Sequence, residues 1–180
     1  DYFNFLDSDP AQTTDWQNFL GYTAKAGVNF NLDEVNNIFV NAGYFSKAPL
    51  FRNVFDYNNN VYKGTKNEKI MSFEVGYGIS TSKLALKFNG YYTRWEDRAL
   101  NTSVTNPATG TNTIFNIFGA TENHYGGEFE GRWMPNRSVE LNGSLSISSD
   151  KFGSDLTAVV RPEDDPTIEK NINSYVNGLY

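Results

Sequence analysis

The sequence predicts an all-β fold, an antiparallel meander of about seven long strands that forms part of a transmembrane β-barrel. Three observations predict it. Apolar and polar residues alternate over stretches about twice as long as the 5–6 residues of an ordinary soluble strand. The connections between these stretches alternate between short and long. The composition of 14 Phe, 11 Tyr and 3 Trp, with 15 Gly, favours strands and turns over helices.

The first two strands are expected at residues 19–32 and 37–46. In the first, every even position is apolar or aromatic, whereas the odd positions from Gly21 to Asn31 hold Gly, Thr, Lys and Asn. A short turn at 33–36 separates the two strands. Residues 1–18, which precede them, are expected to form an extracellular loop.

The next two strands are expected at residues 68–79 and 84–95. Met, Phe, Val, Tyr and Ile alternate with Ser, Glu and Gly in the earlier strand, and residues 80–83 form its short turn. Long polar segments lie on both sides of this pair, at 47–67 and 96–120. We expect both segments to be loops.

The last three strands are expected at residues 121–133, 138–148 and 169–180. The stretch "HYGGEFEGRW" within the first of them places Tyr, Gly, Phe, Gly and Trp on one face and His, Gly, Glu, Glu and Arg on the other. A short turn at 134–137 and a long loop at 149–168 connect these strands.

Strand length and the order of the connections together indicate a barrel rather than a soluble sheet. At ~3.3 Å per residue and a tilt of ~40°, strands of this length span about 25–33 Å, which matches the apolar band of an outer-membrane barrel. All short turns fall at one end of the meander and all long segments at the other, as in barrels with short periplasmic turns and long extracellular loops. The apolar face is therefore expected to face lipid and the polar face to face the lumen.

Three groups of candidate residues follow from this arrangement. Polar residues expected to face the lumen are Lys25, Asn29, Glu74, Lys87, Asn89, Glu122, His124, Glu128, Glu130 and Arg132. Residues expected at the lipid–water interface are Tyr22, Tyr44, Tyr92, Arg94, Tyr125 and Trp133. Loop aromatics that are candidates for substrate contact are Phe51, Phe55, Tyr57, Phe115 and Phe118.

Charge and residue types argue against several other functions. A net charge of −6 without any basic block argues against nucleic-acid binding. His124 is the only histidine and cysteine is absent, so neither a catalytic nucleophile with its base nor a zinc site is expected. Glu128 and Glu130 are a pair of carboxylates, but we expect them to pair with Lys87 or to contact the plug of a barrel rather than to hydrolyse a glycoside. No enzymatic activity and no cofactor are expected, and the acidic segment "RPEDDP" is interpreted as a solvated loop.

Four segments resemble the later part of the barrel of TonB-dependent outer-membrane receptors. They are "YFSKAPLFRNVF", "NEKIMSFEVGYG", "LALKFNGYYTRWEDRAL" and "YGGEFEGRW" followed by "SVELNGSLSISSDKF". The resemblance covers residues 19–180 and implies a 22-stranded barrel in the intact protein, located in the bacterial outer membrane. It also implies import of a scarce nutrient such as a metal chelate, a corrinoid or a glycan.

The resemblance further implies partners: outer-membrane lipid, the TonB complex through an N-terminal part of the family fold, and a surface lipoprotein. No plug domain or TonB box is recognised within the 180 residues, so we expect a fragment with further strands missing at both ends. Two alternatives stay open. One is a passive outer-membrane porin or channel, and the other is a soluble secreted β-sandwich that binds glycans.

Overall fold

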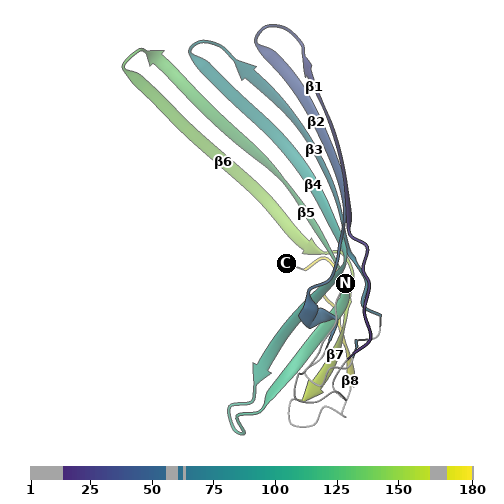
Figure 1. Cartoon of the computed structure of the whole chain (residues 1–180). Helices are drawn as coiled ribbons and strands as arrows, with labels where there is room; N and C mark the ends of the chain where they lie inside the picture. The colour runs from purple at the N-terminus through teal and green to yellow at the C-terminus, as the bar shows by residue number, and fades with distance from the viewer. Residues whose placement is uncertain (1–13, 56–60, 63, 163–169, 180) are drawn as a thin grey trace.

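The described part of the chain forms a single antiparallel sheet of eight strands (Figure 1). The structure is a computed structural model and describes residues 14–55, 61–62, 64–162 and 170–179. The strands are β1 Tyr22–Asn31, β2 Asn36–Lys47, β3 Glu68–Ser80, β4 Leu84–Thr105, β5 Asn112–Asn136, β6 Val139–Phe152, β7 Leu156–Pro162 and β8 Lys170–Ser174, with a short 3-10 helix, η2, at Phe51–Asn53.

Strands β1 to β6 follow one another as a meander, each paired antiparallel with the next. The three short connections between them lie at one end, which we call the turn end, and the opposite end is called the loop end (Figure 1). The register aligns residues in rows across all six strands. One such row consists of Lys25, Gly43, Ser72, Thr93, His124 and Asp150. We call the face that carries this row the inner face and the opposite face the outer face.

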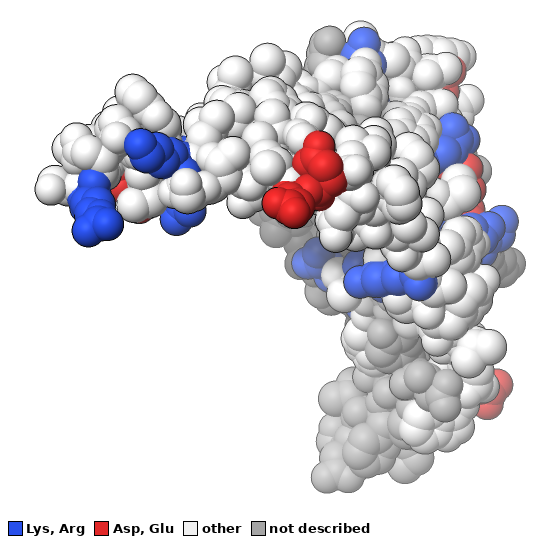
Figure 2. All heavy atoms as spheres, turned by 90° about the horizontal axis from the view of Figure 1, so that it is seen from above, with Lys and Arg blue, Asp and Glu red and all other residues white. Residues whose placement is uncertain are grey.

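The inner face is crowded because the sheet curves around it. A Cβ atom added at Gly76 would lie 2.1 Å from the Phe39 ring, and one added at Gly27 would lie 2.3 Å from the Asn41 side chain. On the outer face, Cβ atoms at Gly90 and Gly127 would meet nothing closer than 3.7 and 3.6 Å. Viewed from above, the sheet is an arc, and both acidic and basic side chains lie along its concave side (Figure 2).

The outer face leaves large apolar side chains uncovered. Val28 is 70% exposed, Ile147 68%, Phe30 63% and Leu145 60%. The buried apolar side chains lie instead around the loop end, at Val54, Phe55, Tyr62, Ala120, Leu156 and Ala158. An apolar surface of this extent needs an apolar environment, so the expected orientation of a barrel wall, with apolar residues toward lipid, agrees with the packing. The chain is part of a transmembrane β-barrel.

In two of the short turns, the side chain of an early turn residue accepts hydrogen bonds from backbone N–H groups later in the turn. Asp33 accepts hydrogen bonds from the backbone N–H groups of Val35 (2.8 Å) and Asn36 (2.7 Å), and from the Asn36 amide. The Asn36 amide, followed by these two N–H groups, holds the pKa of the Asp33 carboxyl below its usual value. In the next turn, the Thr81 hydroxyl accepts a hydrogen bond from the Leu84 N–H at 2.8 Å. These turns fix the register of the strands they join.

The expected loop at 96–120 requires a correction, because β4 and β5 extend through most of it as a hairpin. The pairing is interrupted between Trp95 and Arg98 and again between Arg98 and Leu100. Asp97 (φ 54°) lies in the first irregularity and Gly119 (φ 74°) in the second. Each β-bulge adds one residue to one strand and so exchanges which residues face inward. The inner residues of β4 are odd-numbered up to Trp95 and even-numbered from Arg98 onward.

The expected strand at 169–180 also requires a correction, as does the loop at 149–168. Part of that loop is β7, which pairs with the extended part of β5, and β8 is a short strand that pairs with β7. After β8, the chain returns to the end of β6, where Phe152 N–H donates to the Leu179 carbonyl (2.9 Å) and Gly178 N–H donates to the Phe152 carbonyl (2.7 Å). Strands β7 and β8 are therefore a hairpin at the loop end, not a continuation of the meander.

The two faces can be tested with adjacent residues on β6. In the intact protein, Ile147→Arg places a cation on the lipid side, which costs about 2–4 kcal/mol near the middle of the bilayer. We expect I147R to reduce the amount of folded protein in the membrane several-fold. Ser146→Arg, on the inner face opposite Glu128, is the matched control and is expected to assemble normally. Outer-membrane fractionation with heat-modifiable gel mobility measures both, and equal assembly of the two variants would contradict the assignment of faces.

Candidate functional site

All ten residues expected to face the lumen lie on the inner face. They occupy consecutive rows of the register, from Glu122 and His124 at the loop end to Glu130 and Arg132 at the turn end. Lys25 and Asn29 join the same rows from β1, Glu74 from β3, and Lys87 and Asn89 from β4; the remaining member is Glu128 on β5. This surface is the candidate functional site.

A ladder of amides and carboxylates crosses the middle of the inner face. Asn41 Nδ2 donates to Glu74 Oε2 (3.0 Å), and Asn89 Nδ2 donates both to Glu74 Oε1 (3.1 Å) and to Glu128 Oε2 (3.2 Å). The ladder therefore links four strands, β2 to β5. The Asn89 amide separates two carboxylates that would otherwise face each other across the sheet, and the sequence pattern alone did not indicate this role.

Ion pairs cluster at the loop end of the inner face. Lys47 Nζ lies 3.0 Å from Glu68 Oε2, and the Glu68 side chain is almost fully buried. Arg98 forms an ion pair with Glu122, whose side chain is also largely buried. Buried carboxylates are stable only when paired in this way. Arg98, which was not among the sequence candidates, faces inward only because of the bulge at Asp97.

His124 connects two acidic residues in the same region. Its Nδ1 lies 2.7 Å from Asp150 Oδ1 on β6, and its Nε2 lies 3.4 Å from Glu122 Oε2. The Nε2 atom is buried and makes no hydrogen bond with the described residues. A cavity of about 140 Å³ adjoins these three residues. The arrangement joins β5 to β6.

The cations of the inner face lie over aromatic rings. Lys25 Nζ is 4.9 Å from the centre of the Phe45 ring, and Lys87 Nζ is 5.5 Å from that of Phe39. Trp95 has Arg98 at 4.6 Å on its ring and Lys47 at 5.7 Å. These contacts hold the ammonium and guanidinium groups over the sheet. The inward aromatic residues were missed as site residues, although their odd positions in the alternation could have identified them.

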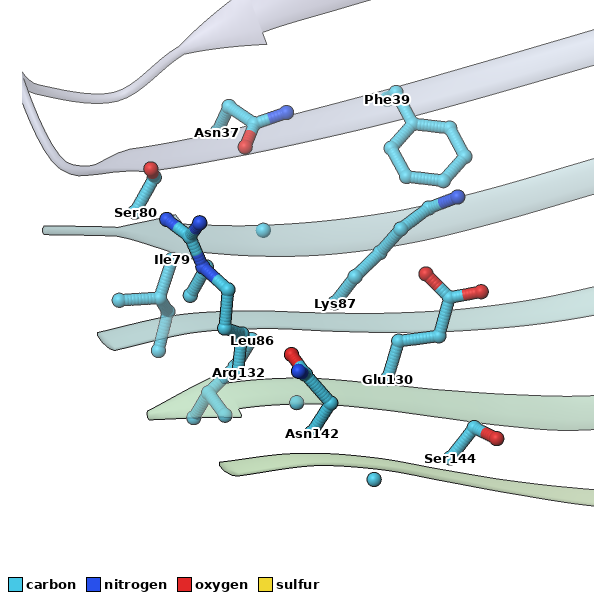
Figure 3. Close-up of a pocket in the computed structure, with 14 residues that line it drawn as sticks. Asn37, Phe39, Ile79, Ser80, Leu86, Lys87, Glu130, Arg132, Asn142 and Ser144 are labelled. Atoms are coloured by element: carbon cyan, nitrogen blue, oxygen red, sulfur yellow. The ribbon is translucent and has the colours of Figure 1, made fainter. Parts of the chain in front are cut away.

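Lys87 does not form the ion pair that was expected for it. Within the part of the chain that the structure describes, no ion pair joins Lys87 to Glu128 or Glu130. Figure 3 shows Lys87, Glu130 and Arg132 projecting from neighbouring strands at the turn end of the inner face. They line a hollow of about 810 Å³ together with Asn37 and Asn142. The hollow is open and mixed in polarity, which suits contact with a polar ligand or protein segment.

The loop aromatics are distributed over different surroundings. Phe55 is buried against Phe51, with ring centres 4.9 Å apart. Phe118 packs against Tyr62 at 5.4 Å, on the outer side of the hairpin. The bulge at Gly119 places Phe115 on the opposite, inner side, in a row adjacent to Leu100 and Ile117. Tyr57 lies outside the described residues.

The residues expected at the lipid–water interface all lie on the outer face. Tyr44 and Arg94 share one register row near the loop end, and Tyr92 and Tyr125 are cross-strand partners in the next row. Tyr22 stacks on Tyr44 with ring centres 5.9 Å apart. Trp133 lies at the turn end, opposite Leu84 and Leu141, and is 50% exposed.

Two kinds of feature are absent from the described residues. They contain no helix long and apolar enough to cross a bilayer. They also contain no group of three or more His, Asp or Glu side chains arranged to hold a metal ion.

The amide ladder predicts a pH-dependent effect of one substitution. Asn89→Asp replaces the shared donor with a third carboxyl, whose ordinary pKa is about 3.9. At pH 8, the three negative charges repel, and we expect the intact variant protein to lose its folded gel mobility at a lower temperature than the wild type. At pH 4, partial protonation relieves the repulsion and the difference becomes smaller. Asn31→Asp, at the turn end of the inner face, is the control, and an equal effect at both pH values would argue against the ladder.

Comparison with known proteins identifies the family. The family model described as "TonB dependent receptor-like, beta-barrel" matches residues 1–174. No curated protein matches the chain, and no solved structure does. The match covers nearly the whole chain and agrees with the all-strand fold and the two-faced sheet. The chain belongs to the TonB-dependent receptor-like β-barrel family, whose members are receptors and transporters of the bacterial outer membrane rather than enzymes.

Proposed function

We propose that this chain is part of the barrel wall of an importer that takes up a scarce nutrient, such as a metal chelate, a corrinoid or a glycan, with energy supplied through TonB. The observation that carries the proposal is the division of the sheet into an apolar outer face and a polar, hydrogen-bonded inner face. A wall of this kind separates lipid from an aqueous lumen.

The partners follow from the same arrangement. The outer face contacts membrane lipid, and the inner face contacts whatever occupies the lumen. Coupling to the TonB complex involves a part of the protein other than these strands, and a surface lipoprotein is a further partner at the loop end. The inner-face ladder and the hollow beside Lys87 and Glu130 support contact with polar groups.

Substrate capture is proposed for the inner side of the hairpin at the loop end. The register places Leu100, Ile117, Ala158 and Ile172 in one row across β4, β5, β7 and β8, with Phe115 in the adjacent row. Arg98 is two residues from Leu100. Its ion pair with Glu122 places charged groups next to this apolar row. This combination of apolar and charged groups suits a ligand that has both kinds of surface.

The two rival functions differ in what they require. A soluble β-sandwich requires two sheets packed face to face, whereas the described residues form one sheet with an exposed apolar face. A passive porin has a similar wall, so these strands do not distinguish it from an importer. The two differ in whether transport requires an energy source.

Energy dependence tests the proposal. Cells that express or lack the full-length receptor are given a radiolabelled ferric chelate, cobalamin or oligosaccharide. We expect uptake of one of these probes to depend on the receptor and to stop when TonB is deleted or the proton gradient is collapsed. Receptor-dependent uptake that persists under both treatments would show a passive channel instead.

Phe115 and Phe118 offer a matched pair for the capture surface. We expect Phe115→Ala to weaken uptake of the transported probe at low concentration, by about tenfold for loss of a 1.4 kcal/mol contact, with normal assembly. Phe118→Ala removes a ring contact with Tyr62 on the outer side, so it is expected to affect assembly more than affinity. Concentration-dependent uptake, normalised to surface-exposed receptor, separates the two effects. Equal apparent affinities for F115A and wild type would contradict the inward placement of Phe115.

A further inference from the structure

We propose that His124 is a proton-binding site that controls the capture of an anionic ligand at the loop end of the inner face. With a proton on its Nε2 atom, the surface beside Arg98 gains one positive charge in excess, which an anionic group of the ligand requires. The inference rests on the proposed capture function and deepens it, because it names the charge of the ligand and the condition under which the ligand binds.

The surroundings of His124 assign the hydrogen of the neutral ring. Nδ1 lies 2.7 Å from Asp150 Oδ1, and an ionised carboxylate only accepts hydrogen bonds, so Nδ1 carries the hydrogen. Nε2 of the neutral ring is then an acceptor. It lies 3.4 Å from Glu122 Oε2, which is also an acceptor, and it is buried without a hydrogen bond to the described residues. The neutral ring therefore leaves two acceptors side by side, at a place where one added proton makes an ion pair.

The His124 ring is within reach of solvent protons. Its side chain is partly exposed on the inner face, although Nε2 itself is covered. Histidine is the side chain that ordinarily exchanges its proton between about pH 5 and pH 8. A proton added at Nε2 lies beside Glu122 Oε2 and replaces the contact between two acceptors with an ion pair. The protonated ring then bridges two carboxylates, Asp150 on β6 and Glu122 on β5.

The charged groups around this ring come from five strands of the described sheet. They are Lys47 on β2, Glu68 on β3, Arg98 on β4, Glu122 on β5, and Asp150 and Lys151 on β6. Lys47 pairs with Glu68, and Arg98 pairs with Glu122, so each of these cations is matched by a carboxylate.

The two charged residues of β6 do not alter this balance on the inner face. Asp150 is mostly exposed, so solvent screens its charge. Lys151 is the next residue in the strand and interacts with Tyr125 on the outer face. While His124 is neutral, the cluster therefore has no positive charge in excess, and protonation of His124 supplies one.

Arg98 is the group that this proton makes available to a ligand. Its guanidinium lies 4.6 Å from the centre of the Trp95 ring, and its side chain is partly exposed beside the apolar row that contains Leu100. While His124 is neutral, turning Arg98 toward a ligand leaves the largely buried Glu122 carboxylate without a cation, which is costly. Protonated His124 gives Glu122 a second cationic partner. Arg98 can then pair with a ligand while Glu122 stays compensated.

The ligand class follows from this arrangement. A guanidinium forms its strongest hydrogen bonds with oxyanions, and the neighbouring row is apolar, so the ligand carries a carboxylate, phosphate or sulfonate group on a partly apolar body. Because the anion binds best to the protonated site, anion and proton bind cooperatively. Over the range in which the ring loses its proton, the affinity for the anion falls by up to about tenfold for each pH unit.

Binding of an anion of fixed charge by the purified full-length receptor tests the site. The probe is meta-benzenedisulfonate, whose sulfonates stay ionised throughout the assay and whose ring suits the apolar row. Isothermal titration calorimetry at pH 5.5 and pH 8 measures its dissociation constant. We expect the wild type to bind the probe about tenfold or more tightly at pH 5.5 than at pH 8. The uncharged analogue meta-benzenedisulfonamide is expected not to bind at either pH.

Substitutions of His124 separate its charge from its packing. H124Q keeps a hydrogen-bonding side chain but cannot be protonated, so it is expected to bind the probe at pH 5.5 as weakly as the wild type does at pH 8. H124K carries a permanent charge and is expected to bind at pH 8 about as tightly as the wild type does at pH 5.5. R98Q is expected to lose binding at both pH values. R137Q removes a cation in the turn between β5 and β6 and is the matched control, with wild-type affinities expected.

Three results would overturn the proposal: no binding of the probe by the wild type at pH 5.5, the same pH dependence in H124Q as in the wild type, or equally weak binding by H124K and H124Q at pH 8. Heat-modifiable gel mobility identifies folded variants before titration, and the comparison of H124Q with the wild type decides the result if H124K assembles poorly. The measurement needs neither TonB nor transport, so its failure is distinct from a failure of energy-dependent uptake.

Discussion

The structure depends on one constraint, which is that a polypeptide crossing hydrocarbon must satisfy every backbone hydrogen bond within itself. Strands β2 to β5 do so by pairing on both sides over their spanning length. Once the backbone is satisfied by a sheet, side chains alternate between two environments, and the sequence has to provide a lipid-compatible and a water-compatible residue in turn. The exposed apolar face and the polar inner face are both consequences of this requirement. Within the described residues, the free edges of β1 and β6 require partner strands in the bilayer for the same reason.

The inner face meets a second constraint, because its polar groups are close together on the concave side of a curved sheet. Carboxylates there need a hydrogen-bond donor between them (a spacer), and cations need an aromatic ring beneath them (a support). Asn89 is such a spacer between Glu74 and Glu128, and Phe39 is such a support for Lys87. The polar wall is therefore a connected network rather than a set of independent solvated side chains. That network gives the wall a defined shape toward the lumen.

Most of the spanning sheet could be predicted from the sequence, because alternation reports directly on the two faces. The first six strands, and the inward direction of residues such as Glu128, followed from it. The pattern failed where bulges changed the phase, at Asp97 and Gly119, because neither an aspartate nor a glycine at a single position marks a bulge in the alternation. It also failed at β7 and β8, which are short and lie beyond the membrane band. Contacts such as Arg98 with Glu122 could not be predicted because they join residues whose relative phase the bulges set.

The two bulges also explain how one hairpin serves two surfaces. The bulges lie just beyond the row of Tyr92 and Tyr125 on the loop side. They place Arg98 and Phe115 on the inner side and Asp97 on the outer side, beside Lys69. Without this change of phase, continued alternation would direct Asp97 into the lumen and Arg98 toward the lipid headgroups. The bulges therefore lie where the environment changes from hydrocarbon to water, which is also where strict alternation between lipid and lumen ceases to be required. Above that level the chain is free to use the inner side for apolar contact, and the sheet does so with the row that Leu100 and Ile117 share.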